Sequence, residues 1–178
     1  YKSQSLIEYL GSTWRIGGRL PDTFVTVVPP QMRVAGSETW YRGTADAVFQ
    51  NLNLVQDFGP ELVAVFGADH IYRMDLRQMI EFHLRVNADI TVAAQPIPLE
   101  RARGFGVISA AADGRILGFA EKPTRPAPMV SDPTCALGSM GNYIFRRDVL
   151  VDLLLADARR ETEHDFGATI LPGVVGDH

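Results

Sequence analysis

The chain has 178 residues, 46% of them hydrophobic and 21% charged, which is typical of one globular domain and gives no indication of disorder. A formal net charge of −4 without any run of Lys and Arg argues against nucleic acid or an anionic membrane surface as the main partner. The single cysteine, Cys135, excludes an internal disulfide framework and indicates a reducing cytoplasm, and no apolar stretch approaches the length of a membrane span.

The first 60 residues contain patterns for two helices and one strand. Weakly amphipathic spacing predicts a short helix over residues 3–14, interrupted near Gly11. Phe and Val residues predict a strand over 24–28. Residues 45–58 have apolar side chains at helical spacing, and Thr44 is the predicted N-cap of this helix.

An unbroken apolar run over residues 62–66 stops at Gly67, and Asp69 and His70 follow. The run shows neither helical spacing nor strict alternation, which predicts a strand buried on both faces of a mainly parallel sheet. Open α/β sheets bind ligands outside the carboxyl ends of their strands. Asp69 is therefore a candidate metal ligand for a phosphate-bearing substrate, and His70 is interpreted as a residue that shapes the turn.

The next segment continues the alternation of helix and strand. Asp75 is a candidate N-cap for a helix that extends through Asn87, and residues 90–95 form the following strand. This order predicts an α/β fold with crossover connections and a mostly parallel sheet. His83 lies beside the apolar face of the helix and is interpreted as a packed or solvated residue rather than a ligand.

From residue 104 onward, short apolar runs predict an antiparallel excursion. Runs over 104–110 and 115–123 flank a hairpin signal at 112–114. The second run contains Glu121 and Lys122 just before a proline. A surface ion pair and a sugar-phosphate site fit these two residues equally well from the local pattern.

The last part of the chain predicts one more strand and two helices. The strand covers 139–145, an amphipathic helix covers 148–158, and a short helix follows His164. Asp165 is the simplest cap for that last helix.

Six motifs in this order resemble bacterial glucose-1-phosphate adenylyltransferases, also called ADP-glucose pyrophosphorylases. They are WYRGTADA (40–47), GADHIY (67–72), FGV (105–107), EKP (121–123), SMG (139–141) and HDFG (164–167). The resemblance implies a Rossmann-like α/β fold with a mostly parallel mixed sheet flanked by helices, incomplete at both ends. It also implies transfer of the adenylyl group of ATP to α-D-glucose 1-phosphate, giving ADP-glucose and pyrophosphate, in glycogen synthesis by a cytoplasmic homotetramer.

The resemblance implies roles for individual residues at the matching positions. Asp69 would act at the catalytic centre by holding Mg²⁺ against the phosphates. The positions that match the nucleotide site are Gln31, Tyr41, Gly43 and Thr44. The positions that match the sugar-phosphate site are Gly106, Glu121, Lys122 and Ser139. Gln31 and Trp40 match a loop that passes the allosteric signal to the active site.

The same family has parts that the chain does not show. A glycine-rich phosphate loop is expected before Tyr1, and a second metal-binding aspartate and a β-helix domain are expected beyond His178. We therefore expect residues 1–178 to be a partial catalytic domain that is inactive alone. Two alternatives stay open: a uridylyl- or thymidylyltransferase of the same fold, and a non-catalytic regulatory subunit.

Overall fold

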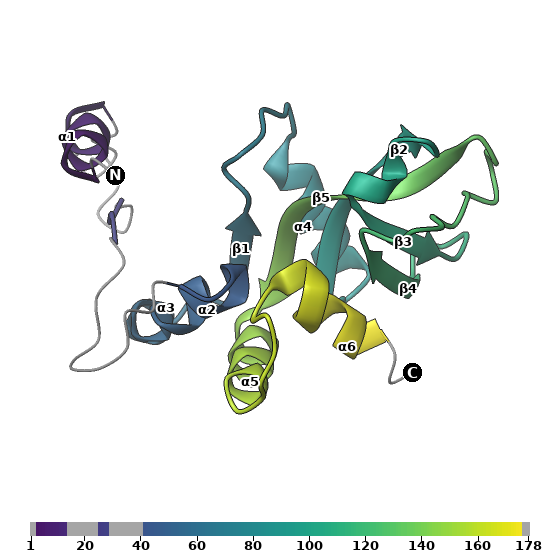
Figure 1. Ribbon diagram of the computed structural model, residues 1–178. Coiled ribbons are helices and arrows are strands. Elements are labelled where there is room, and N and C mark those ends of the chain that lie inside the picture. The colour runs from purple at the N-terminus through teal and green to yellow at the C-terminus, as the bar shows by residue number, and fades with distance from the viewer. Residues whose placement is uncertain (1–2, 14–24, 29–40, 176–178) are drawn as a thin grey trace. The chain divides into compact units, whose positions relative to one another are not determined.

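The computed structural model describes residues 3–13, 25–28 and 41–175 (Figure 1). The chain divides into two units, Tyr1–Tyr41 and Arg42–His178. In the first unit, helix α1 covers Ser3–Thr13 and continues through Gly11, so the predicted interruption is wrong. Residues 25–28, the described part of the predicted strand, have no regular secondary structure. A strand needs hydrogen bonds from a neighbouring strand, which apolar spacing alone does not supply.

The second unit is organised around strand β5, Cys135–Arg146. Strand β2, Ile90–Pro98, pairs along one edge of β5. Strands β1, Leu62–Phe66, and β3, Gly106–Ala110, pair with successive parts of the other edge. Strand β4, Ile116–Glu121, pairs with β3 and completes the five-stranded sheet. The described elements therefore form a mixed α/β architecture.

The strand pairing differs from the predicted mostly parallel sheet, because every pairing among the described strands is antiparallel. Strands β1 and β2 do run in the same direction, since both are antiparallel to β5, but β5 lies between them. The predicted burial of β1 on both faces is also wrong: Ala64 is exposed and the other four residues are half-buried. Among the described strands β1 has only β5 as a neighbour, which leaves part of it open.

The helix predicted over 45–58 is two helices, α2, Thr44–Phe49, and α3, Leu52–Phe58. The break has a local cause at Asn51. Its side-chain amide donates to the carbonyl of Ala47 at 2.8 Å, the acceptor that a continuous helix would offer to the Asn51 backbone N–H. That N–H donates instead to Val48. Asn side chains compete with the helix ladder in this way.

Helix α4, Leu76–Arg85, begins as predicted, because the Asp75 side chain accepts a hydrogen bond from the Arg77 backbone N–H. On α4, His83 is 1% exposed and lies 2.8 Å from the Thr91 hydroxyl of β2, so its interpretation as a packed residue is confirmed. Strand β2 runs past the predicted end at 95. Its one neighbour among the described strands is β5. The prolines at 96 and 98 are tolerated because the outer edge of such a strand needs no N–H donor.

The predicted hairpin is confirmed, with β3 paired to β4 and Gly114 at a φ of +88° in the turn. After a short 3₁₀ turn η2, Ala102–Gly104, and the hairpin, the chain continues through β5 into helix α5, Arg147–Asp157. A π-helical turn η3, Phe166–Ile170, leads into α6, Leu171–Val175. Among the described residues, no helix has the length and apolar character needed to cross a membrane.

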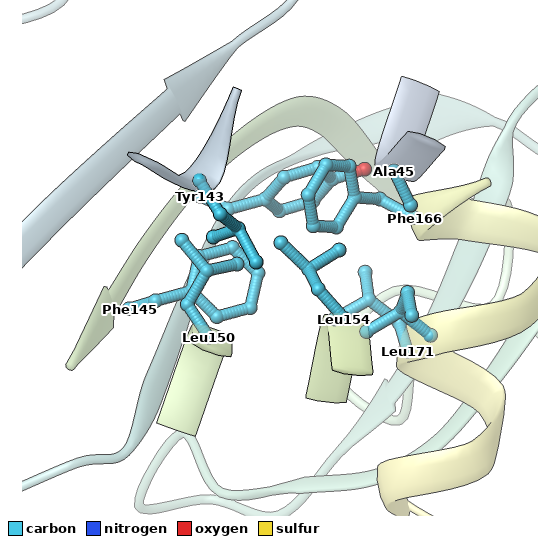
Figure 2. Packing of buried hydrophobic residues seen from close by; sticks show 9 residues of the cluster. Ala45, Tyr143, Phe145, Leu150, Leu154, Phe166 and Leu171 are labelled. Atoms are coloured by element: carbon cyan, nitrogen blue, oxygen red, sulfur yellow. The ribbon is translucent and has the colours of Figure 1, made fainter. Parts of the chain in front are cut away.

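One hydrophobic cluster joins β5 to α2, α5 and the C-terminal turns. The Phe166 ring centroid lies 5.5 Å from that of Phe145 and 5.7 Å from that of Tyr143. Figure 2 shows these rings packed with the side chains of Ala45, Leu150, Leu154 and Leu171. The cluster places the start of α2 beside the turn at 164–166, and that junction forms part of the candidate site.

Candidate functional site

The turn that carries Asp69 lies beside the middle of β5. The Gly67 backbone N–H donates to the Gly141 carbonyl at 3.1 Å, and the Gly141 N–H donates to the Ser139 hydroxyl at 3.3 Å. The carboxyl end of β1 is therefore connected through Gly141 to Ser139, a residue predicted for the sugar-phosphate site.

The Asp69 carboxylate is open to solvent, with its side chain 94% exposed. Its Oδ1 lies 3.1 Å from Nδ1 of His70. This hydrogen bond, followed by one from the Asp69 backbone, holds the pKa of the carboxyl below its ordinary value. Asp69 is thus ionised at neutral pH, and His70 is its hydrogen-bond partner in the turn.

Asp69 could offer a metal ion one carboxylate ligand. No group of three or more His, Cys, Asp or Glu side chains that could hold a metal occurs among the residues that the structure describes. Magnesium prefers hard carboxylate oxygens, keeps several waters and takes further oxygens from substrate phosphates. A single exposed carboxylate can contribute one ligand to such an ion, whereas it cannot build a closed protein cage.

Glu121 ends β4 in a slot formed by two glycines. A Cβ on Gly106 would lie 2.9 Å from Glu121 Oε2, and a Cβ on Gly167 would lie 2.7 Å from the same atom. Lys122 follows at a φ of +43°, with its Nζ 3.4 Å from Glu121 Oε1 and its side chain 66% exposed. The Lys122 ammonium is on the exposed side of this pair, so an anionic ligand can reach it.

Tyr143 lies near Ser139 and near the negative charges of two carboxylates. Burial raises the pKa of the Tyr143 hydroxyl, a hydrogen bond with Ser139 opposes the rise, and the negative charges of Asp165 and Glu121 add to it. Ser139 and Tyr143 lie four residues apart on β5, so their side chains project from the same face. The predicted sugar-phosphate residues thus share one region with Tyr143 and Asp165.

Asp165 receives hydrogen bonds from two segments. Its Oδ2 accepts from the Thr44 hydroxyl at 2.8 Å, and its Oδ1 accepts from the backbone N–H groups of Gly167 and Ala168 at 2.8 and 3.0 Å. Burial opposes ionisation, but the hydrogen bonds from Ala168, Thr44 and Gly167 together lower the pKa of this carboxyl. The predicted capping role of Asp165 is confirmed.

The predicted capping role of Thr44 is wrong, because Gly43 is the N-cap of α2 and Thr44 is its first residue. The Thr44 hydroxyl donates to Asp165, and it also accepts from the Phe166 backbone N–H at 3.2 Å. Gly43 has a steric role: a Cβ there would lie 2.3 Å from the Glu163 carbonyl oxygen and 2.4 Å from that of His164.

The structure brings together four residues expected on the sugar-phosphate side, Gly106, Glu121, Lys122 and Ser139. Gly43 and Thr44 adjoin them through Asp165. Gln31 and Trp40 lie outside the described residues, and Tyr41 belongs to the first unit.

Sequence reasoning missed Tyr143 and Gly167 and assigned Asp165 only a capping role. The alternation of β5 would have placed Tyr143 on the Ser139 face, and Asp165 and Gly167 lie within the HDFG motif at 164–167.

A family model described as nucleotidyl transferase matches residues 1–178. The chain is 55% identical over 176 residues to a glucose-1-phosphate adenylyltransferase of Thermodesulfovibrio yellowstonii, which covers 99% of this chain and 42% of that protein. Its identity to the glucose-1-phosphate adenylyltransferase of Thermus caldophilus is 49%, over 98% of this chain and 43% of that protein. A Vibrio vulnificus protein named glucose-1-phosphate adenylyltransferase 1 is 48% identical, over 97% of this chain and 42% of that protein. The chain spans less than half the length of these relatives, and it belongs to the nucleotidyl transferase family.

Proposed function

We propose that this chain is part of the catalytic domain of a glucose-1-phosphate adenylyltransferase, which transfers the adenylyl group of ATP to α-D-glucose 1-phosphate and releases pyrophosphate. The observation that carries the proposal is the identity of about half of all residues, over nearly the whole chain, to relatives with that name. The grouping of Gly106, Glu121, Lys122 and Ser139, the positions that match the family's sugar-phosphate site, also supports it.

The proposal includes the finer features implied by the family. These are a Rossmann-like α/β fold, and residues 1–178 as a portion of the catalytic domain. The phosphate loop, the second metal aspartate and the β-helix domain would belong to the full-length protein, a cytoplasmic homotetramer in glycogen synthesis. The isolated residues 1–178 would have no appreciable activity.

On the sugar side, the chemistry is positioning and charge neutralisation. The Glu121 carboxylate would accept hydrogen bonds from sugar hydroxyls, since the glycine slot leaves its oxygens in a defined place. The exposed Lys122 ammonium would neutralise the sugar phosphate. Ser139 would contact the sugar. Holding the phosphate oxygen in line with the α-phosphorus of ATP contributes much of the acceleration in such reactions.

On the nucleotide side, the proposed contacts are Gln31, Tyr41, Gly43 and Thr44. The proposed allosteric loop contains Gln31 and Trp40. Asp69, kept ionised by His70, would hold Mg²⁺. When bound, the metal ion neutralises charge on the triphosphate and on the leaving pyrophosphate.

The test is pyrophosphate release by the full-length protein supplied with glucose 1-phosphate and Mg²⁺, comparing ATP with UTP and dTTP. Preference for ATP supports the proposal. Preference for UTP or dTTP would favour the other nucleotidyltransferases, and no turnover with any of the three would favour a regulatory subunit.

Lys122→Ala examines the sugar-phosphate assignment in the same assay. The KM for glucose 1-phosphate is expected to rise about tenfold or more, with the KM for ATP nearly unchanged, because one charge-assisted contact to phosphate is lost. Arg125→Ala removes an exposed cation three residues away and is the matched control. Equal changes in both KM values for Lys122→Ala would contradict the assignment.

A further inference from the structure

A closed polar network holds the turn that precedes Asp165. His164 is 2% exposed, and its Nδ1 lies 2.7 Å from Oδ2 of Asp157, a buried residue at the end of α5. The Thr162 hydroxyl donates to Asp157 Oδ1 at 2.8 Å, and the His164 backbone N–H donates to the Thr162 oxygen at 3.2 Å. Three side chains thus tie the 162–164 segment to the C-terminus of α5.

The backbone of His164 has a φ of +50°, in the left-handed region that side chains other than glycine seldom adopt. Such a conformation persists where the surroundings hold it, and here the buried imidazole is held by Asp157. In this conformation the His164 carbonyl accepts hydrogen bonds from the first amides of α2, Ala45 at 2.9 Å and Asp46 at 3.1 Å. The following residue, Asp165, accepts from Thr44.

We propose that the Asp157–His164 pair is a positioning device that holds the nucleotide-side helix α2 and the sugar-side carboxylate Asp165 at a fixed separation. The inference rests on the proposed function, which assigns α2 to the nucleotide side and Asp165 to the sugar side of the site. His164 is a positioning residue and not a catalytic one: its imidazole is buried, and its Nε2 has no hydrogen-bond partner in the described parts of the chain. It acts through its carbonyl and through its neighbour Asp165.

The chain offers a matched control in His83. This histidine is also buried, at 1% exposed, and its Nδ1 also lies within hydrogen-bond distance of a side chain, the Thr91 hydroxyl. Thr91 pairs with Ile144, whose side chain points to the sheet face opposite those of Tyr143 and Phe145. Removing the His83 ring therefore opens a similar gap in the fold without touching the junction between α2 and Asp165.

The experiment compares His164→Ala, Asp157→Ala, the double variant and His83→Ala in the full-length protein. Two quantities are measured: hydrogen exchange of the Ala45 and Asp46 amides, and kcat and KM for ATP and glucose 1-phosphate. Each single change at the pair is expected to raise exchange at these amides about tenfold relative to β5 amides, because their acceptor is released. It should lower kcat/KM about tenfold or more for both substrates.

The double variant should show no larger rise in exchange and no larger loss of kcat/KM than either single variant, because the two residues act as one unit. His83→Ala should change the exchange ratio and both KM values less than twofold. Changes for His164→Ala that match those of His83→Ala would overturn the inference. Thr162→Val removes one hydroxyl from the same network and replaces His164→Ala in the experiment if that variant does not fold. An unchanged exchange ratio in Thr162→Val would also overturn the inference.

The exchange measurement separates this inference from the proposed function. If the wild-type protein does not form ADP-glucose while exchange at Ala45 and Asp46 rises as expected, the proposed function fails and the positioning device stands. If the wild-type protein forms ADP-glucose while exchange and kinetic constants stay at wild-type values in the variants, the device fails alone.

Discussion

Replacing Gly43 by alanine would force the loop before α2 away from the 163–164 backbone. The added Cβ would lie 2.3 Å from the Glu163 carbonyl oxygen and 2.4 Å from the His164 carbonyl oxygen. Ordinary non-bonded contacts are roughly 3.5 Å, so the two backbones would have to separate by about 1 Å. The φ of −164° at Gly43 is extended and open to any residue, so the steric contact alone decides the outcome.

The magnitude follows from the hydrogen bonds that cross this contact. The His164 carbonyl accepts from Ala45 and Asp46 at 2.9 and 3.1 Å, and Thr44 donates to Asp165 at 2.8 Å. A separation of about 1 Å would break or weaken all three, and at about 0.5–1.5 kcal/mol each the expected loss of unfolding free energy is about 1.5–4.5 kcal/mol.

Hydrogen exchange of the slowest β5 amides in the full-length protein measures this loss. Gly104→Ala is the control, because a Cβ there would meet nothing within 4 Å, and its effect should stay within about 0.5 kcal/mol. A Gly43→Ala protein with the same β5 exchange as the Gly104→Ala protein would refute the reasoning. It would mean that the loop can move aside without losing its contacts to Asp165 and His164.

Three further predictions concern the proposed metal ligand Asp69, a buried histidine and the core. Asp69→Asn should lower turnover of the full-length protein by orders of magnitude without changing its unfolding, and near-normal turnover would remove Asp69 from the mechanism. Burial lowers the pKa of His83 below its ordinary 6.5; the positive charge of Arg146 lowers it further, and the negative charge of Asp89 partly opposes the shift. The unfolded chain then binds a proton at His83 more readily than the folded chain does, so the contribution of His83 to stability is present above pH 6.5 and is lost as the pH falls through that value. His83→Gln should flatten this pH dependence of the unfolding free energy in urea titrations. An unchanged dependence on pH would contradict the prediction. Phe145→Ala, at a fully buried position, should cost about 3–5 kcal/mol in the exchange of β5 amides, and a loss below about 1 kcal/mol would contradict the core assignment.

The sequence by itself determined those elements whose signals are local. Asp75 and Asp165 cap their helices because the side chain and the amides that it accepts from are two or three residues apart. The β3–β4 hairpin follows from turn residues between two short apolar runs. The candidate site residues Glu121, Lys122 and Ser139 came from motifs that resemble one family, and they required no knowledge of strand order.

Only the tertiary structure decided which segments meet. Local periodicity does not show that β5 inserts between β1 and β2, because the strand that separates them is encoded about 40 residues after β2. Likewise Thr44 looks like a helix cap in sequence, whereas its hydroxyl donates to Asp165, 121 residues away. Capping, turns and amphipathic spacing are set by neighbours in the chain, but strand pairing and the contacts of Thr44, Tyr143 and Glu121 depend on packing of the whole domain.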